Sequence, residues 1–288
     1  MSDPSIFEEA FATSTDGLSL YYRDYNNVGD NGRLPVLCLP GMTRNSKDFE
    51  ELAPHLAKTR RVMCADLRGR GRSEADPDIA HYNPRTYMGD MWQVLDHAGV
   101  PGVAVVGTSL GGIMAMLMAT SNPDRVKGAV LNDIGPVLER EGLDRITNYV
   151  SATDAVPTWA DAAEAARIAN EAFLADYGTD DWMTFARRIF VEDTDGTIRP
   201  DFDPGIAEAM RASEGGPTEM WPIFEGLKPI PALVIRGAIS DLLSDAGVDQ
   251  MAAQKPDLQR VNVPNRGHVP SLGEPECLTA IDAFFADL

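Results

Sequence analysis

Residues 102–120 read Gly-Val-Ala-Val-Val-Gly-Thr-Ser-Leu-Gly-Gly-Ile-Met-Ala-Met-Leu-Met-Ala-Thr, and this stretch decides the fold. Its apolar beginning is typical of a buried strand, and its small apolar end favours a buried helix. Between them, residues 107–111 match the pattern Gly-x-Ser-x-Gly. A sharp strand-to-helix turn needs neighbours without side chains, which Gly107, Gly111 and Gly112 supply, and it exposes the serine at the carboxyl end of the sheet. We therefore predict that Ser109 is a nucleophile; the alternatives are a spectator serine in a tight turn and a phosphate-binding loop, which would need a lysine and another glycine spacing.

Strand and helix patterns alternate on both sides of this stretch. The apolar runs favour a mostly parallel sheet covered by helices on both faces, an α/β fold. The predicted strands are 18–25, 36–39, 61–65, 102–107, 126–131, 231–235 and 259–263, and the predicted helices of this part are 46–58, 86–98, 113–120 and 274–286.

The alternation stops between about residues 134 and 222. No confident strand is predicted there, whereas 161–177, 181–190 and 204–212 have helical patterns. We therefore expect a core formed by 1–134 and 222–288, with a helical cap, 135–221, inserted over the sheet.

A serine hydroxyl needs a general base that is oriented by a carboxylate. Of the four histidines, His268 lies in a Gly-His-Val-Pro loop directly after the last predicted strand, where it can reach the carboxyl edge of the sheet. We predict it as the base. The acid should follow a strand, and Asp241 is our prediction; Asp245 and Asp133 remain alternatives, and each could instead cap a helix or belong to a turn.

These motifs together resemble the α/β-hydrolase superfamily, in its serine-nucleophile branch with a helical cap, a group of esterase and enol-lactonase type. The resemblance rests on 39–42 (Leu-Pro-Gly-Met), 66–73 (Asp-Leu-Arg-Gly-Arg-Gly-Arg-Ser), 107–112, Asp241 and 267–268, and on the chain order Ser, Asp, His. It implies a catalytic triad and an oxyanion hole formed by the backbone N–H groups of Met42 and Leu110. The stretch 66–73 is interpreted as a structural turn and not as catalytic; the alternative is that two of its arginines, which lie near glycines, bind an anion.

The resemblance implies a serine hydrolase that cleaves a carboxylic ester or a lactone of a small, largely apolar substrate through an acyl-enzyme. The alternatives are a hydrolase of C–C bonds in ring-cleavage products and a slow-turnover small-ligand receptor of the same fold. The mechanism needs no metal and no organic cofactor. Aromatic residues of the cap could line the pocket, and the candidates for substrate binding are Trp159, Trp182 and Trp221.

Composition restricts the other possibilities. The 288 residues carry 44 acidic and 25 basic side chains, a net charge of -19, which disfavours nucleic acid and anionic membranes as partners. No apolar stretch is long enough to span a bilayer, and the first residues lack the features of a signal peptide. Three widely spaced cysteines make no disulfide framework, which favours the cytoplasm. The sequence leaves open whether the protein is a homo-oligomer.

Overall fold

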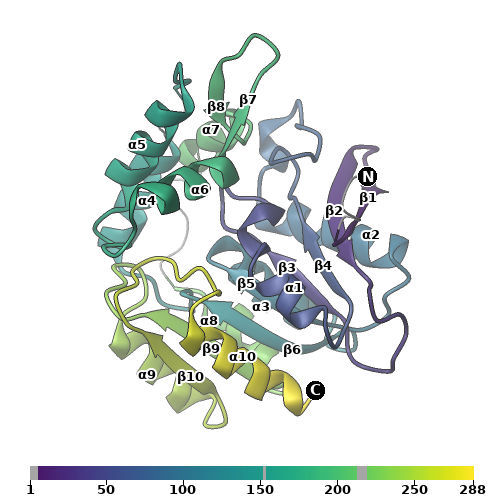
Figure 1. Cartoon of the computed structure of the whole chain (residues 1–288). Helices are drawn as coiled ribbons and strands as arrows, with labels where there is room; N and C mark the ends of the chain where they lie inside the picture. The colour runs from purple at the N-terminus through teal and green to yellow at the C-terminus, as the bar shows by residue number, and fades with distance from the viewer. Residues whose placement is uncertain (1–5, 152–153, 213–218) are drawn as a thin grey trace.

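The computed structural model describes residues 6–151, 154–212 and 219–288. Its centre is an eight-stranded sheet in the order β1-β2-β4-β3-β5-β6-β9-β10 (Figure 1). β2 pairs antiparallel with β1 and β4, and the remaining neighbours in this sheet, β4–β3, β3–β5, β5–β6, β6–β9 and β9–β10, pair in parallel. The strands are β1 Glu8–Thr13, β2 Ser19–Tyr25, β3 Val36–Leu39, β4 Val62–Ala65, β5 Val103–Thr108, β6 Val126–Asn132, β9 Ala232–Gly237 and β10 Gln259–Val263. The predicted α/β class is confirmed.

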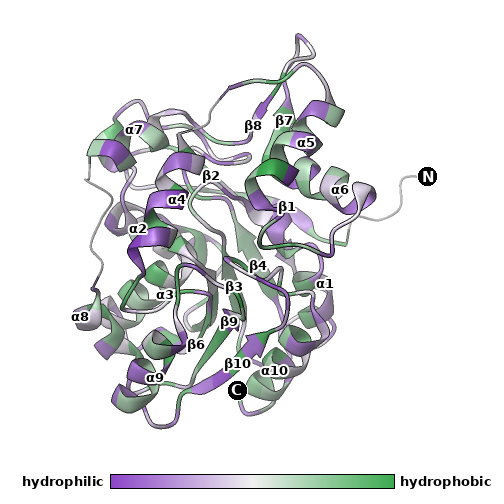
Figure 2. Cartoon of the chain, turned by 90° about the vertical axis from the view of Figure 1, so that its left-hand side faces the viewer, coloured by the Kyte–Doolittle hydropathy of each residue, from purple (hydrophilic) through white to green (hydrophobic). Residues whose placement is uncertain are grey.

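Helices cover both faces of this sheet (Figure 2). Alternate residues of β5 point to opposite sides, so Val103 and Val105 pack into one buried apolar cluster and Ala104 and Val106 into the other. The first cluster includes α2 Pro84–His97, α3 Leu110–Ser121, α8 Trp221–Phe224 and α9 Asp245–Gln254, and the second includes α1 Leu52–Leu56 and α10 Pro275–Ala286. This two-sided burial explains the continuous apolar runs in the sequence.

The part of the chain from α4 to α7, between β6 and α8, lies at one end of the sheet (Figure 1). Its elements are α4 Arg140–Val150, α5 Trp159–Asn170, α6 Thr179–Ile189, β7 Phe190–Glu192, β8 Ile198–Pro200 and α7 Gly205–Ala212. It has an apolar cluster of its own, in which Trp182, Ala186 and Ile198 are buried. Residues 152–153 and 213–218 of the predicted cap lie outside the described residues.

Three local expectations were wrong. The predicted helix 161–177 ends at Asn170, where α5 gives way to turns. The predicted helix 46–58 is a short 3-10 turn, Ser46–Phe49, followed by α1, because Pro54 has no N–H for a helical hydrogen bond and its ring disfavours a continuous helix. The inserted segment also contains the antiparallel pair β7–β8, where no strand was expected. These strands are joined by a turn in which Gly196 has φ +85°, so the Asp195-Gly196 dipeptide was the missed hairpin signal.

Among the described helices, none has both the length and the apolar character needed to cross a membrane.

Candidate active site

Ser109 lies at the sharp turn between β5 and α3. Its φ of 51° is in the left-handed region that side chains rarely adopt, so the surrounding packing must hold it there. That packing excludes side chains at two neighbours. A Cβ on Gly107 would lie 2.2 Å from the carbonyl oxygen of Gly111, and one on Gly111 would lie 2.1 Å from that of Leu39. The two glycines of the motif are therefore required by the turn that presents Ser109.

His268 contacts Ser109 from the loop that follows β10. Its Nε2 lies 3.0 Å from Ser109 Oγ, and its Nδ1 lies 2.8 Å from Asp133 Oδ2. The imidazole is thus hydrogen-bonded on both sides, to a hydroxyl and to a carboxylate. The sequence prediction placed Ser109 and His268 in one site, and the structure brings them together.

Asp133 follows β6 directly and is fully buried. Its Oδ1 accepts a hydrogen bond from the Gly237 N–H at 2.8 Å, and its Oδ2 accepts one from Ser240 Oγ at 2.6 Å, in addition to the His268 contact. These donors fix the direction of the carboxylate towards the imidazole. Asp133 was the third candidate from the sequence.

The prediction of Asp241 as the carboxylate partner of His268 is corrected by this geometry. The Asp241 carboxylate instead accepts hydrogen bonds from Arg145 of α4, from Nε at 2.5 Å and Nη2 at 2.9 Å. Burial opposes its ionisation, but the hydrogen bonds and charge of Arg145, with a smaller effect of His268, lower the pKa of Asp241. In the loop after β9, Ser240 donates a hydrogen bond from its hydroxyl to Asp133, and the next residue, Asp241, contacts Arg145 of α4. The other rival, Asp245, begins α9 and pairs with Arg236 at 3.0 Å.

Met42 and Leu110 lie beside Ser109, as the proposed oxyanion donors must. Both line a cavity with Ser109, and Leu110 is the first residue of α3, so its N–H has no partner within the helix. A Cβ on Gly41 would lie 3.9 Å from Ser109 Cβ, so the β3 loop passes close to the serine. The Met42 carbonyl accepts a hydrogen bond from Arg70 Nε at 2.8 Å. The role of the two amides stays a prediction.

The stretch 66–73 supports the site through its packing. The buried Asp66 accepts hydrogen bonds from the N–H groups of Ser46 at 2.7 Å and Arg72 at 2.8 Å. A Cβ on Gly71, which has φ +54°, would lie 2.2 Å from Asp66 Oδ2. Asp66 therefore ties this turn to the loop after β3, next to the site.

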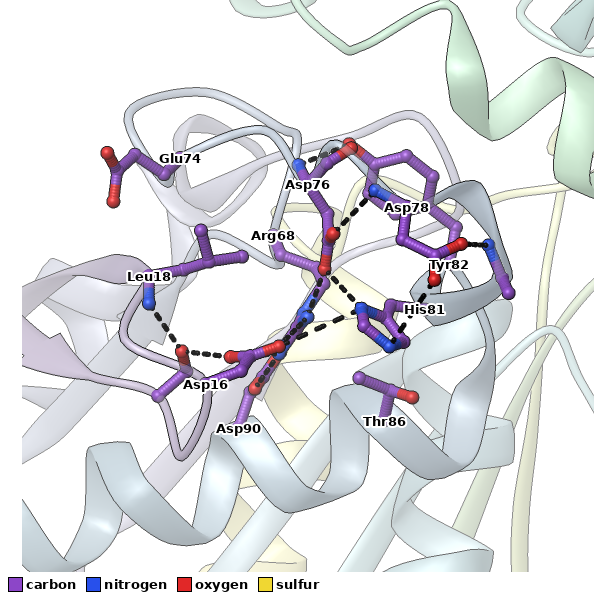
Figure 3. A network of polar contacts seen from close by, with 12 residues as sticks. Asp16, Leu18, Arg68, Glu74, Asp76, Asp78, His81, Tyr82, Thr86 and Asp90 are labelled. Atoms are coloured by element: carbon purple, nitrogen blue, oxygen red, sulfur yellow. Dashed lines mark hydrogen bonds and ion pairs between the residues drawn. The ribbon is translucent and has the colours of Figure 1, made fainter.

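Arg68 of the same stretch is at the centre of an acidic cluster (Figure 3). Its guanidinium donates to Asp16 at 2.8 Å, to Asp90 at 2.6 Å and to Asp76. His81 Nδ1 lies 2.9 Å from Asp76 Oδ2. Asp16, Asp76 and His81 have ligand atoms close enough together for a cation, but Arg68 already supplies positive charge there. Hydrogen bonds from Arg68, followed by one from Ser14, lower the pKa of Asp16 to about 2.

Two cavities meet at Ser109. The first, of about 120 Å³, is lined by His268 and by residues of the inserted segment such as Arg145, Phe173 and Phe185; we call it the histidine-side cavity. The second, of about 510 Å³, has mostly apolar walls that include Ile113, Leu117, Leu138, Leu143, Ile206 and Met220; we call it the apolar cavity. Met42, Ser109 and Ile146 line both.

The three predicted substrate-binding tryptophans do not line these cavities. Trp182 is buried against Tyr177, with ring centroids 5.1 Å apart, and Trp159 Nε1 donates to Glu192 at 2.8 Å. Trp221 packs against Phe224. The prediction failed because these rings complete the internal packing of the inserted segment and of α8, an alternative that composition cannot distinguish from a pocket.

Aromatic side chains reach the cavities from other positions. Tyr149, Phe173, Tyr177 and Phe185 line the histidine-side cavity, and Tyr82 and Tyr87 line the apolar one. The arginines of the histidine-side cavity have acidic partners: Arg44 pairs with Asp48, Arg145 with Asp241, and Arg188 with Glu51.

The fold and the serine–histidine–aspartate arrangement define a hydrolase of the α/β class. The family model described as alpha/beta hydrolase fold matches residues 35–275, and the chain belongs to this family. It is 32% identical over 275 residues to a 3-hydroxybutyrate-oligomer hydrolase of Cupriavidus necator, covering 92% of this chain and 93% of the relative. It is 28% identical to a 2-(acetamidomethylene)succinate hydrolase of Mesorhizobium japonicum, covering 90% of each chain. The crystal structure of an alpha/beta hydrolase from Novosphingobium aromaticivorans superposes with a TM-score of 0.93 at 41% identity and covers 99% of this chain and 100% of that one.

Proposed function

We propose that this hydrolase cleaves carboxylic esters through an acyl-enzyme on Ser109. His268 Nε2 takes the proton of the Ser109 hydroxyl as the oxygen attacks the carbonyl carbon, and it then delivers this proton to the leaving alkoxide. Asp133 holds the proton on Nδ1 and stabilises the imidazolium. The observation that carries the proposal is the hydrogen-bonded line from Ser109 Oγ through His268 to Asp133, with distances of 3.0 Å and 2.8 Å.

The oxyanion that forms in this step needs donors on the side of Ser109 opposite to His268. The backbone N–H groups of Met42 and Leu110 would supply them. Each such donor contributes roughly 3 to 4 kcal/mol to the stability of the transition state in a site that excludes water. A water molecule activated by His268 then attacks the acyl-enzyme and releases the acid.

The two cavities suggest how a substrate lies. Because His268 must protonate the leaving oxygen, the alcohol part belongs in the cavity that His268 lines, which is the smaller one. The acyl part then occupies the apolar cavity of about 510 Å³. Two separate cavities that share one serine suit an open-chain ester better than a lactone, in which the acyl and alkoxy parts form one ring.

The relatives point in the same direction. An oligomer of 3-hydroxybutyrate is an open-chain aliphatic ester, and the Cupriavidus hydrolase is similar to this chain over nearly its whole length. We therefore infer that small aliphatic esters are the substrate class, with residues 135–221 acting as a cap that shapes both cavities. We expect the binding partner to be a small-molecule substrate, and we expect the protein to act in the cytoplasm.

The experiment measures steady-state hydrolysis of p-nitrophenyl esters with acyl chains of two to twelve carbons, together with lactones and a β-diketone of similar size. We expect repeated turnover on the esters and an acyl adduct on the Ser109 peptide in quenched samples analysed by mass spectrometry. Faster cleavage of the lactones or the β-diketone would overturn the ester assignment. A single stoichiometric burst without turnover would favour a receptor role.

A further inference from the structure

Arg70 has an unusual environment for an arginine. It is 1% exposed, and it donates hydrogen bonds to two backbone carbonyls, from Nε to Met42 at 2.8 Å and from Nη1 to Arg68 at 2.7 Å. Its Nη2 is buried and has no hydrogen-bond partner within residues 6–151, 154–212 and 219–288. A buried guanidinium N–H group without an acceptor is costly, which suggests that a ligand supplies one.

The charge of Arg70 also lacks a counterion in the described part of the chain. Arg68, two residues earlier and equally buried, has three carboxylate partners, whereas the partners of Arg70 are neutral: two backbone carbonyls, the rings of Tyr82 and Tyr87, and the Tyr87 hydroxyl. The protein has an excess of acidic residues, yet none of the described ones pairs with this cation. A buried cation is stabilised most by an anion at hydrogen-bond distance.

Burial without an anion does not by itself define a binding site, as Arg60 illustrates. Arg60 is 1% exposed, donates to the carbonyls of Leu34 and Phe285, and packs on the Phe285 ring, and its Nε is likewise buried without a hydrogen-bond partner among the described residues. Burial lowers its pKa. Neither cavity at Ser109 includes Arg60 in its walls.

Arg70 differs from Arg60 because it lines the apolar cavity that contains Ser109. The guanidinium carbon lies 4.7 Å from the centroid of Tyr87 and 5.7 Å from that of Tyr82, and both rings also line this cavity. Arg70 Nε donates a hydrogen bond to the carbonyl of Met42, and Met42 lines the apolar cavity as well. The charged end of Arg70 is therefore surrounded by residues of the cavity wall, in a chamber whose other walls are mainly apolar.

We propose that Arg70 binds a carboxylate at the far end of the acyl chain, so that half-esters of linear dicarboxylic acids are preferred over esters of alkanoic acids. This inference rests on the proposed function, since it assigns the acyl part to the apolar cavity. The alkyl chain of such a substrate contacts the apolar walls, and its carboxylate accepts a hydrogen bond from the unpaired Nη2 N–H group of Arg70. A carboxylate satisfies the hydrogen bond and the charge together, whereas a neutral carbonyl satisfies only the first.

The test compares matched pairs of p-nitrophenyl esters, each with one acyl length and either a methyl or a carboxylate terminus, from four to eight carbons. We expect the wild-type protein to prefer the carboxylate member at one length by between roughly 10-fold and 100-fold in kcat/KM, the range of one charge-assisted hydrogen bond. Arg70→Met removes the preference. It also frees the Met42 carbonyl and slows both esters, but the ratio within a pair cancels this common loss. Arg70→Lys keeps the charge and retains part of the preference.

Arg85→Met is the matched control, because Arg85 is an exposed cation on the wall of the same cavity. We expect it to leave the preference nearly unchanged. The inference is overturned if the wild-type ratio of kcat/KM between the carboxylate and methyl esters is near one at every length. It is also overturned if this ratio falls in Arg85→Met and persists in Arg70→Met. In both cases the proposed ester hydrolysis is unaffected. If neither ester is cleaved, binding of adipate to Ser109→Ala measured by calorimetry decides: binding that is lost on adding Arg70→Met keeps the carboxylate site without the proposed reaction, and no binding removes both.

Discussion

Replacing Asp133 by asparagine should nearly abolish hydrolysis while the fold is retained. The carboxylate accepts from the Gly237 N–H at Oδ1 and from His268 Nδ1 at Oδ2. In Asp133→Asn the amide oxygen must stay opposite the Gly237 N–H, so the NH₂ group faces His268. An NH₂ donor selects the imidazole tautomer that carries its proton on Nε2, and this tautomer cannot take a proton from Ser109.

The expected loss is about 10⁴-fold in kcat, or about 5.5 kcal/mol of transition-state stabilisation. Asp241→Asn is the matched control, since it makes the same chemical change at the residue that the sequence favoured. Its carboxylate binds Arg145 at 2.5 Å and 2.9 Å, in a partly exposed pair. We expect less than about a tenfold loss of kcat there, because such pairs contribute little.

The assay is hydrolysis of p-nitrophenyl butyrate by both variants, with circular dichroism and the melting temperature as controls for folding. The reasoning is refuted if Asp241→Asn loses as much activity as Asp133→Asn while both variants melt as the wild type does. In that case the loop after β9 would have to move Asp241 to His268 during the reaction.

Three further outcomes are expected. Ser109→Ala should lower kcat by several orders of magnitude and leave the melting temperature unchanged or higher, because the substitution removes only the hydroxyl group. Near-normal turnover would refute the nucleophile assignment. Arg68→Met should lower the free energy of unfolding by about 3 to 5 kcal/mol, since it leaves buried carboxylates without their cation, whereas Arg72→Met, at a half-exposed pair, should cost less than about 1 kcal/mol in urea titrations. Asp16 has its pKa lowered to about 2 from an ordinary 3.8, so its ion pair stabilises the fold above pH 3.8 and this contribution is lost as the pH falls towards 2. The urea midpoint of Asp16→Asn should therefore lie below that of the wild type at pH 7 by a small margin that shrinks at pH 3, and a margin that grows on acidification would contradict this.

Local signals in the sequence were sufficient for the serine and the histidine. The glycines around Ser109 are required by contacts within a few residues and with the adjacent strand β3, so the motif carries its own geometry. His268 follows the last strand of the sheet, and this position alone brings it to the carboxyl edge. Strands such as β5 and β9 were predicted for the same reason, because burial on both faces leaves continuous apolar runs.

Features that depend on tertiary packing were not predictable. Trp182 is buried inside the internal cluster of the inserted segment, whereas Phe185, three positions later on α6, packs against that cluster and also lines a cavity. The sequence favoured a structural turn for the stretch that contains Arg70 and gave anion binding by two of its arginines as the alternative. The missing counterion of Arg70 is visible only when the partners of Arg68 and Arg70 are compared in three dimensions.

The choice between Asp133 and Asp241 shows why chain order alone could not identify the acid. β6 and β9 are adjacent and parallel, so the residues that follow them emerge side by side at the same edge of the sheet. Asp133 has φ 53°, a conformation that aspartate tolerates better than most residues, and the Gly237 N–H at the end of the neighbouring strand donates to it. The end of β9 and the loop after it thus supply two hydrogen-bond donors to Asp133, the Gly237 N–H and the Ser240 hydroxyl. Asp241 of the same loop pairs instead with Arg145 of α4. Two neighbouring strand ends can exchange these roles without any change in the order Ser, Asp, His, so the hydrogen bonds of the histidine, and not the sequence order, decide which carboxylate acts.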